Sequence, residues 1–271
     1  MGRFGSWVLG CLPMREVWTR ARRLPVVGGF LHALASNALP AGGAWVNIRG
    51  GPLAGRPFLC DPRYHLGYVR GDHEPWVVQW MDSLLKPGAK FVDVGAHLGY
   101  FTIVALHLGR VGRVVSFEPD PLSYRMLAEN VRAAKPQVPI DIRQEAVGAF
   151  CGRVSFAAGC DVNAHVGRGS SVVYVPQVRL DDLNLKPPLL IKVDVEGAEI
   201  DVLRGAGSLM SPLADVAWII EVHGPALEER TCRLLERKGY ACTTHQPVHP
   251  TYPEYRQRYV VAVRRLRGSF G

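Results

Sequence analysis

The sequence lacks any apolar run of the roughly 18 residues that a membrane-spanning helix requires. The apolar stretch before Cys11 is also too short for the core of a secretory signal peptide, and we therefore expect a cytoplasmic protein. None of the six cysteines forms a C-x-x-C pair, and their spacing matches no zinc site. Free thiols in a reducing compartment are the resulting expectation.

Acidic residues are too few to balance the basic ones. The chain has 32 Lys and Arg against 24 Asp and Glu, and many of the arginines lie in residues 15–23 and 256–267. An excess of this kind can attract nucleic acid or an anionic membrane surface. No basic motif interleaved with aromatic residues accompanies it, so a solvated basic surface is favoured. Peripheral membrane contact through the basic N-terminal segment remains an alternative.

What the sequence does contain is the pattern of an α/β domain. A length of 271 residues, with 48% hydrophobic and 21% charged residues, suits one globular domain with an extension. From residue 75 onward, strand-like apolar runs alternate with segments of helical periodicity. The predicted strands are 91–94, 114–117, 140–142, 189–193, 216–222, 240–244 and 259–264, and the predicted helices are 76–85, 100–108, 121 onward, 198–203 and 225–239. This alternation implies a largely parallel sheet with right-handed crossovers.

The helix expected at residue 121 has clear signals at its start. Asp120 is a good N-cap residue, and Pro121 suits the first helical turn. The apolar spacing predicts a buried face made of Leu122, Met126, Leu127 and Val131.

Two other segments do not follow the alternation of strands and helices. Residues 1–60 are predicted to be an N-terminal extension or cap, with a helix at 14–24 and short strands at 44–48 and 57–60. Residues 153–156 and 172–178 alternate like the strands of a hairpin. Between them, the polar and glycine-rich residues 159–171 are expected to be a mobile loop that shields the acceptor pocket. Residues 61–271 form the predicted main domain.

A glycine loop follows the first strand of that domain, where parallel sheets bind nucleotides. Gly95 and Gly99 let the backbone approach a ligand closely, and the next helix offers free N–H groups at its N-terminus. His97 stands where a dinucleotide fingerprint needs glycine, which argues against a pyrophosphate and for a smaller, singly charged tail. Asp93 is placed to approach the ammonium group of such a ligand. The second strand ends at Glu118, whose carboxylate could accept hydrogen bonds from both ribose hydroxyls.

These features favour a methyltransferase that uses S-adenosylmethionine. The alternative is an ordinary tight turn between strand and helix, with a solvated Glu118.

Five motifs carry a resemblance to a known family. They are GDHEP at 71–75, FVDVGAHLGYFT at 91–102, SFEPDP at 116–121, AVG at 146–148 and LIKVDVEGAE at 190–199. With them the chain resembles FkbM-type methyltransferases, a branch of the class I S-adenosylmethionine-dependent enzymes, although that family has Asn where His97 stands. The resemblance implies a Rossmann-like fold with a mostly parallel seven-stranded sheet and helices on both faces. It also implies methylation of a hydroxyl on a sugar-containing or other natural-product acceptor.

We expect the cofactor to contact residues within or beside these motifs. They are Glu74, Asp93, Gly95, Ala96, His97, Gly99, Tyr100, Glu118, Pro119, Ala146 and Asp194.

Candidate catalytic residues gather at the ends of two later strands. Lys192 and Asp194 lie on one face because side chains alternate along a strand. Glu221 and His223 share a face of the next strand in the same way, so Asp194 and His223 should meet in one crevice. Glu196 and Glu199 are also expected near this cleft, although Glu199 could simply be a charge at a helix N-terminus.

The expected chemistry is removal of a proton from an acceptor hydroxyl. His223, Asp194 or Glu221 could serve as the base; His223 is the predicted one, oriented by Glu221, and Asp194 takes over the role if His223 does not. The acidic residues could instead hold Mg²⁺, which we do not favour. An RNA ribose methyltransferase and a non-catalytic S-adenosylmethionine-binding scaffold remain competing interpretations. No pattern indicates an oligomeric state.

Overall fold

The computed structural model describes residues 43–158, 171–249 and 256–264. The predicted helix at 14–24 and nearly all of the predicted loop at 159–171 lie outside these ranges. Within them, no helix is long and apolar enough to cross a membrane. Among the described residues, Cys60, Cys151, Cys232 and Cys242 take part in no disulfide bond.

A seven-stranded sheet forms the centre of the molecule, in the order β11-β12-β10-β9-β3-β4-β5. Its strands are β3 (Lys90–Val94), β4 (Arg113–Phe117), β5 (Ile140–Arg143), β9 (Leu189–Val193), β10 (Val216–Glu221), β11 (Tyr240–His245) and β12 (Tyr259–Arg264). All neighbours pair in parallel except β12, which runs antiparallel to both β10 and β11. This confirms the predicted mostly parallel sheet and puts β3 between β4 and β9.

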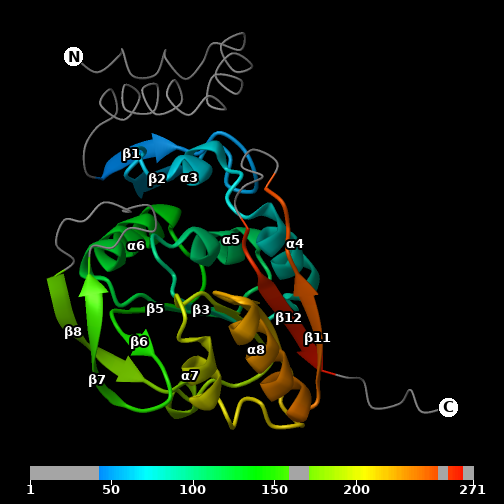
Figure 1. Cartoon of the computed structure of the whole chain (residues 1–271). Helices are drawn as coiled ribbons and strands as arrows, with labels where there is room; N and C mark the ends of the chain where they lie inside the picture. The colour runs from blue at the N-terminus through cyan, green and yellow to red at the C-terminus, as the bar shows by residue number, and fades with distance from the viewer. Residues whose placement is uncertain (1–42, 159–170, 250–255, 265–271) are drawn as a thin grey trace, which may run out of the picture.

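Helices cover both faces of this sheet (Figure 1). One face carries α4 (Pro75–Leu84), α5 (Tyr100–Leu108) and α6 (Pro121–Ala134), and the other carries α7 (Glu199–Arg204) and α8 (Pro225–Arg237). Successive residues of a strand serve opposite layers, because Leu190 packs in the core with α4 and α5 while Ile191 packs in the core with α7 and α8. Burial on both faces explains why these strands are continuous apolar runs rather than alternating ones.

The start of α6 follows its predicted signals. Asp120 Oδ1 accepts hydrogen bonds from the backbone N–H groups of Leu122, at 2.9 Å, and Ser123, at 2.8 Å. The predicted buried face is wrong at one position, because Leu122 is 56% exposed. Leu122 lies five residues before the fully buried Leu127, which turns it about 140° away around a helix of 3.6 residues per turn.

The described part of the N-terminal segment packs against the main sheet's helices. Strands β1 (Ala44–Asn47) and β2 (Pro57–Cys60) form an antiparallel ribbon, and the unpredicted helix α3 (Leu66–Arg70) follows. The buried side chain of Asn130 on α6 accepts from Leu59 N–H at 2.6 Å and donates to Leu59 C=O at 2.9 Å. The ribbon shares a hydrophobic core with α4 and α5. The domain boundary at residue 60 remains a prediction.

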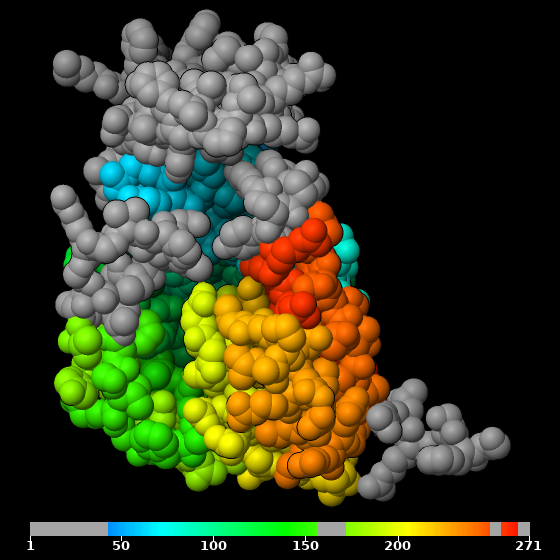
Figure 2. Space-filling model, viewed as in Figure 1, coloured from blue at the N-terminus to red at the C-terminus, as the bar shows by residue number. Residues whose placement is uncertain are grey.

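A second, three-stranded sheet contains the predicted hairpin. It consists of β6 (Ala146–Val147), β8 (Ser171–Val178) and β7 (Gly152–Ala158), in that order. The pairing of β7 with β8 is antiparallel, as expected, while the short β6 was not predicted as a strand. Figure 2 shows a furrow on the visible face between the green atoms of this region and the yellow atoms near residue 200.

Candidate functional site

The glycine loop after β3 has a backbone that only glycine accommodates at its first position. Gly95 has φ 78°, and a Cβ added there would lie 1.8 Å from the carbonyl oxygen of Asp194. The N–H groups of Gly95 and Ala96 both donate to Phe117 C=O at the end of β4, at 3.0 and 2.9 Å. The loop is therefore wedged between the ends of β4 and β9, with Gly99 at the start of α5.

Glu118 fastens this loop to the end of β4. Its Oε2 accepts from His97 N–H at 2.7 Å, and its Oε1 accepts from Asp120 N–H at 2.8 Å. Burial raises the pKa of Glu118 to about 7, although His97 and the two hydrogen bonds act in the opposite direction. Each carboxylate oxygen keeps a second lone pair, so the predicted contact with ribose hydroxyls stays a prediction. Pro119 is half-buried beside it.

His97 adopts φ 50° and contacts the N-terminal segment. Its Nδ1 lies 3.1 Å from the hydroxyl of Tyr68 on α3. Tyr68 in turn stacks on Tyr100 with ring centroids 5.3 Å apart. The buried hydroxyl of Tyr100 has no hydrogen-bond partner in the described part of the chain, and burial raises its pKa. These rings connect the glycine loop to the N-terminal segment.

Lys192 is the buried cation of the site. Its Nζ lies 3.4 Å from Asp194 Oδ2 and 4.0 Å from Asp93 Oδ1. Burial lowers the pKa of Lys192, but Asp194, Asp93 and two more carboxylates outweigh this effect and raise it overall. Thr102 donates to Asp93 Oδ2 at 2.7 Å, while Asp93 Oδ1 accepts no hydrogen bond from the described residues. A lysine held charged in this way positions carboxylates and is a poor proton acceptor.

Glu74 and Glu221 form a second buried group with Gln257 and Tyr259. Gln257 Nε2 donates to Glu74 Oε1 at 2.9 Å and reaches Glu221 Oε2 at 3.4 Å. Tyr259 donates to Glu221 Oε2 at 3.2 Å. Burial raises the pKa of Glu74 to about 7 and that of Glu221 well above its ordinary value. The sequence analysis missed Gln257 and Tyr259, because nothing in their local pattern marks them as partners of residues so distant in the chain.

His223 follows the end of β10 and contacts a different glutamate from the one predicted. Its Nδ1 lies 2.7 Å from Oε1 of Glu199, which is fully buried at the start of α7. Glu221 Oε1 is 3.9 Å from Nε2, too far for a hydrogen bond. The predicted orientation of His223 by Glu221 is therefore wrong, and Glu199 is the residue that orients the ring. Side-chain alternation along β10 predicts which residues share a face of the strand, but it carries no information on Glu199, which lies on α7.

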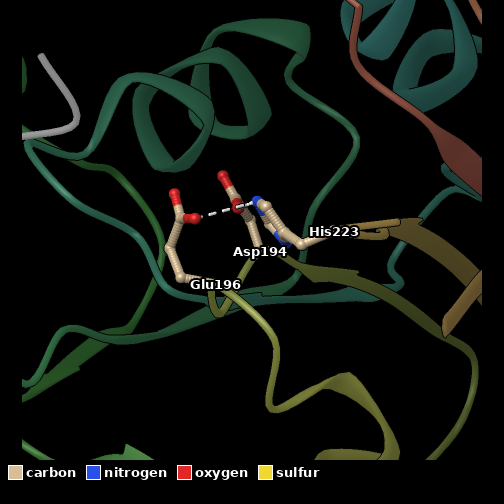
Figure 3. Close-up of side chains that lie close together, drawn as sticks. All are labelled: Asp194, Glu196 and His223. Carbon is tan, nitrogen blue, oxygen red and sulfur yellow. Dashed lines mark ion pairs between the residues drawn. The ribbon is translucent and has the colours of Figure 1, made fainter.

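The opposite ring nitrogen of His223 faces two other carboxylates (Figure 3). Nε2 lies 3.1 Å from Glu196 Oε2 and 4.0 Å from Asp194 Oδ1. Burial lowers the pKa of His223, but the hydrogen bond to Glu199 and the charges of Glu196 and Asp194 raise it overall. The structure thus brings Asp194 and His223 into one place, as the strand ends suggested. One potential ligand atom from each of Asp194, Glu196 and His223 lies within 4.8 Å of the others.

Ala146 is the one predicted cofactor residue outside the strand ends and loops described above. It lies on β6, which pairs with β8 in the three-stranded sheet, and its side chain is half-buried. This placement does not test whether Ala146 contacts the cofactor, so its role in cofactor binding stays a prediction.

The matching family model and the curated relatives described here are methyltransferases. The profile of the methyltransferase FkbM domain matches residues 93–251. A ribosomal protein L11 methyltransferase of Symbiobacterium thermophilum is 31% identical over 87 residues, which cover 32% of this chain and 28% of that protein. Methyltransferase 1 of Beauveria bassiana is 27% identical over 189 residues, which cover 58% of this chain and 74% of that protein.

Among solved structures, the methyltransferase FkbM of Methylobacillus flagellatus KT is similar with a TM-score of 0.48 and 18% sequence identity. The match covers 69% of this chain and 51% of that chain. The chain therefore spans about half of that crystallised protein, and less than a third of the L11 methyltransferase.

Proposed function

The chain belongs to the FkbM methyltransferase family, and on this premise we propose that it methylates a hydroxyl of a sugar-containing, other small-molecule or glycan acceptor. Its methyl donor is S-adenosylmethionine, as for the methyltransferases to which it is related. The observation that favours a hydroxyl as the methylated group is the 2.7 Å distance between His223 Nδ1 and the buried Glu199. A hydroxyl must lose a proton when it is methylated, and an imidazole held by a buried carboxylate is suited to accept one.

The residues around the glycine loop fit S-adenosylmethionine, a ligand with an ammonium group and a sulfonium. Asp93 Oδ1 and Glu74 Oε2 are buried oxygens that accept no hydrogen bond from the described residues, and both suit a cationic ligand. The absence of a side chain at Gly95 lets the loop pack against the backbone of Asp194, so the loop and the end of β9 lie side by side. We propose that Gly95, Ala96, His97, Gly99 and Tyr100 line the cofactor, and that Glu118, Pro119 and Ala146 lie on its ribose and adenine side.

In the proposed mechanism the cofactor supplies an activated methyl group, and the chain's residues orient the acceptor and take up its proton. An in-line displacement needs above all alignment of the attacking oxygen, which can remove several kcal/mol from the barrier. Asp194, held in place by Lys192, orients the acceptor hydroxyl. His223 Nε2 takes the hydroxyl proton, and Glu199 stabilises the resulting imidazolium through Nδ1. Glu221 stays in the buried group with Gln257 and supports the position of Lys192.

The cofactor half of the proposal is tested by calorimetry. S-adenosylmethionine and S-adenosylhomocysteine should bind in the micromolar range, about −8 kcal/mol. Glu118→Ala should weaken both by about 10- to 100-fold, because a charge-assisted hydrogen bond contributes roughly 1.5–3 kcal/mol. Glu129→Ala, on the exposed face of α6, is the matched control and should bind as the wild type does. Binding of NADH in place of S-adenosylhomocysteine would refute the assignment.

The acceptor half is tested by transfer of a radiolabelled methyl group into cell extract, fractionated into lipid, glycan, small molecule, RNA and protein. Label in a glycan or small-molecule fraction supports the proposal, and its loss in His223→Ala ties the label to this site. Label in RNA that falls as salt is raised would instead favour a nucleic-acid methyltransferase, which the net charge of +8 makes the second candidate. Tight cofactor binding without transfer to any fraction would favour a non-catalytic scaffold.

The wider organisation is part of the same proposal. Residues 61–271 would form the methyltransferase domain, and residues 1–60 an extension whose basic arginines could touch an anionic membrane surface of the cytoplasm.

A further inference from the structure

We propose that Asp194, Glu196 and His223 bind a divalent transition-metal cation of the zinc type. They come from two neighbouring places in the fold, the loop after β9 and the end of β10 (Figure 3). One nitrogen and two carboxylate oxygens are a donor set that zinc accepts, and a fourth position would stay open. The cation and the acceptor hydroxyl would then compete for the same imidazole nitrogen.

The spacing of the donor atoms suits a single ion. An ion about 2.1 Å from each ligand can bridge atoms up to about 4.2 Å apart. The separations from His223 Nε2 to Glu196 Oε2, at 3.1 Å, and to Asp194 Oδ1, at 4.0 Å, both lie within this span. Small rotations of the largely exposed Glu196 would complete the geometry without moving the backbone.

Glu199 provides an independent observation, because it prepares the ring for a cation without being a ligand itself. A carboxylate only accepts hydrogen bonds, so Nδ1 carries the proton of this 2.7 Å contact, which leaves Nε2 for another partner. Nε2 faces the carboxylates of Glu196 and Asp194, and these stabilise a positive charge at this position, whether a proton or a metal ion. Metal-binding histidines commonly donate their second N–H to a carboxylate in this way. Glu199 is fully buried, and its Oε2 accepts no hydrogen bond within the described ranges.

The local charge also favours a cation over an anion. Glu196, Asp194, Glu199 and Glu221 all lie within 4.0 Å of the ring nitrogens of His223. Lys192 compensates Asp194 at 3.4 Å, but its side chain is only 3% exposed and its charge is shared with Asp93, 4.0 Å away. The imidazole nitrogen is what selects a zinc-type ion, since Mg²⁺ takes oxygen ligands and retains its water.

A metal at this site would inhibit the transferase, a consequence that rests on the proposed function of His223. An ion bound to Nε2 occupies the lone pair that would otherwise accept the hydroxyl proton. Inhibition should therefore depend on Glu196, which binds the ion in this scheme and takes no part in the methyl transfer itself.

The binding test uses metal alone on the full, reduced, metal-free chain, without cofactor or acceptor. Zn²⁺ is titrated by calorimetry, and Co²⁺ serves as the spectroscopic probe because zinc has no visible absorption. The wild type should bind one equivalent at this site, and Glu196→Gln and Asp194→Asn should each bind that equivalent at least about tenfold more weakly. Glu129→Gln, an exposed glutamate on α6, is the matched control and should keep it.

Folding of each variant is checked by urea unfolding, which separates a lost metal ligand from a misfolded chain. Equal Zn²⁺ and Co²⁺ binding by the wild type, Glu196→Gln and Asp194→Asn would overturn the site, since cysteines elsewhere would then account for it. Absence of cofactor binding alongside Glu196-dependent Co²⁺ binding would refute the proposed function and leave the metal site standing.

Inhibition is measured as radiolabelled methyl transfer into the acceptor fraction of extract. Added Zn²⁺ should suppress transfer by the wild type, and a chelator should restore it. Glu196→Gln should need at least about tenfold more Zn²⁺ for the same suppression, relative to its own metal-free rate. Equal sensitivity of the two proteins would overturn the competition.

Discussion

At the scale of single residues, the site consists largely of buried carboxylates whose partners are few. Glu118 illustrates the balance, because two backbone N–H groups favour its charged form while burial favours the neutral one. Burial prevails, and the pKa is raised from 4.5 to about 7. A group of this kind makes the stability of the cofactor-free protein depend on pH.

The first prediction follows from that shift. Below pH 4.5 Glu118 is protonated in both states, and as pH rises the unfolded chain ionises first. The stability contributed by the neutral buried carboxyl is therefore lost between pH 4.5 and about 7. Glu118→Gln cannot ionise, so urea unfolding should show the variant gaining on the wild type across this window, by about 3 kcal/mol at most. A difference that stays constant with pH would contradict the shift.

The second prediction concerns the base. His223→Ala should lower kcat by about 10²-fold or more and leave the affinity for S-adenosylmethionine nearly unchanged, because the ring acts on the acceptor. The kcat of Glu199→Gln should lie between those of the wild type and His223→Ala, since an amide can still hold Nδ1 but carries no charge.

Glu221→Gln is the comparison that tests whether Glu199, rather than Glu221, orients the ring of His223. If His223→Ala turns over normally while Asp194→Ala does not, the base is Asp194, and if both turn over normally, alignment alone drives the transfer.

The sequence predicted part of this site for reasons visible in particular residues. Alternation along a strand was enough to place Asp194 and His223 at one edge of the sheet. It could not reveal Glu199 as the partner of His223, because that contact depends on the turn at Glu196, which has φ 50°. Gln257 could not be predicted either, since its contact with Glu74 joins residues 183 positions apart.

At the scale of elements, the loop after β3 depends on the absence of a single side chain. Gly95 has a positive φ, and a Cβ added there would lie 1.8 Å from the carbonyl oxygen of Asp194, so a side chain at this position has two separate costs. Gly55 has a similar φ of 80° but no atom within 4 Å of an added Cβ. The pair allows the cost of the backbone conformation to be separated from the cost of the collision.

The third prediction uses this pair. Gly95→Ala should destabilise the protein by about 3 kcal/mol or more, because strain and collision add. Gly55→Ala should cost about 1–2 kcal/mol, the cost of the left-handed conformation alone. Urea unfolding of both variants gives the comparison. Equal losses would mean that the loop after β3 moves aside freely.

The elements themselves were largely predictable. The apolar runs that alternate with helical segments predicted each strand of the main sheet to within two residues at either end. The hairpin of β7 and β8 was predicted from the alternation of its side chains with a period of two. The structure adds α3 and β6, which are five and two residues long. Segments so short carry too few residues for a periodic signal, and tertiary contacts decide their conformation.

At the scale of the whole molecule, Asn130 links three parts of the fold. Its buried amide bonds both backbone groups of Leu59 on β2 and also donates to Leu98 C=O in the glycine loop, at 2.9 Å. A change at this residue should therefore affect the N-terminal ribbon and the cofactor loop together.

The fourth prediction tests that link. Asn130→Ala leaves three backbone groups without their partner and should cost about 3 kcal/mol or more, at roughly 1–3 kcal/mol for each unsatisfied group. Affinity for S-adenosylhomocysteine should fall as well, because the loop loses its anchor. Asn47→Ala, at an exposed position of β1, is the control and should change stability by no more than about 0.5 kcal/mol. Loss of stability with normal cofactor affinity would show that the loop is held without Asn130.

The place of β12 in the sheet has a consequence for how the protein is made on the ribosome. β12 is the last described strand in chain order, yet it is inserted between β10 and β11. When β10 and β11 have left the ribosome, the edges that they will pair with β12 stay unpaired until residues 259–264 emerge. Unpaired strand edges expose the nascent chain to aggregation. Tyr259 emerges with that strand and Gln257 just before it, so the buried carboxylates of Glu74 and Glu221 gain these partners only after β11 and the residues that follow it have emerged.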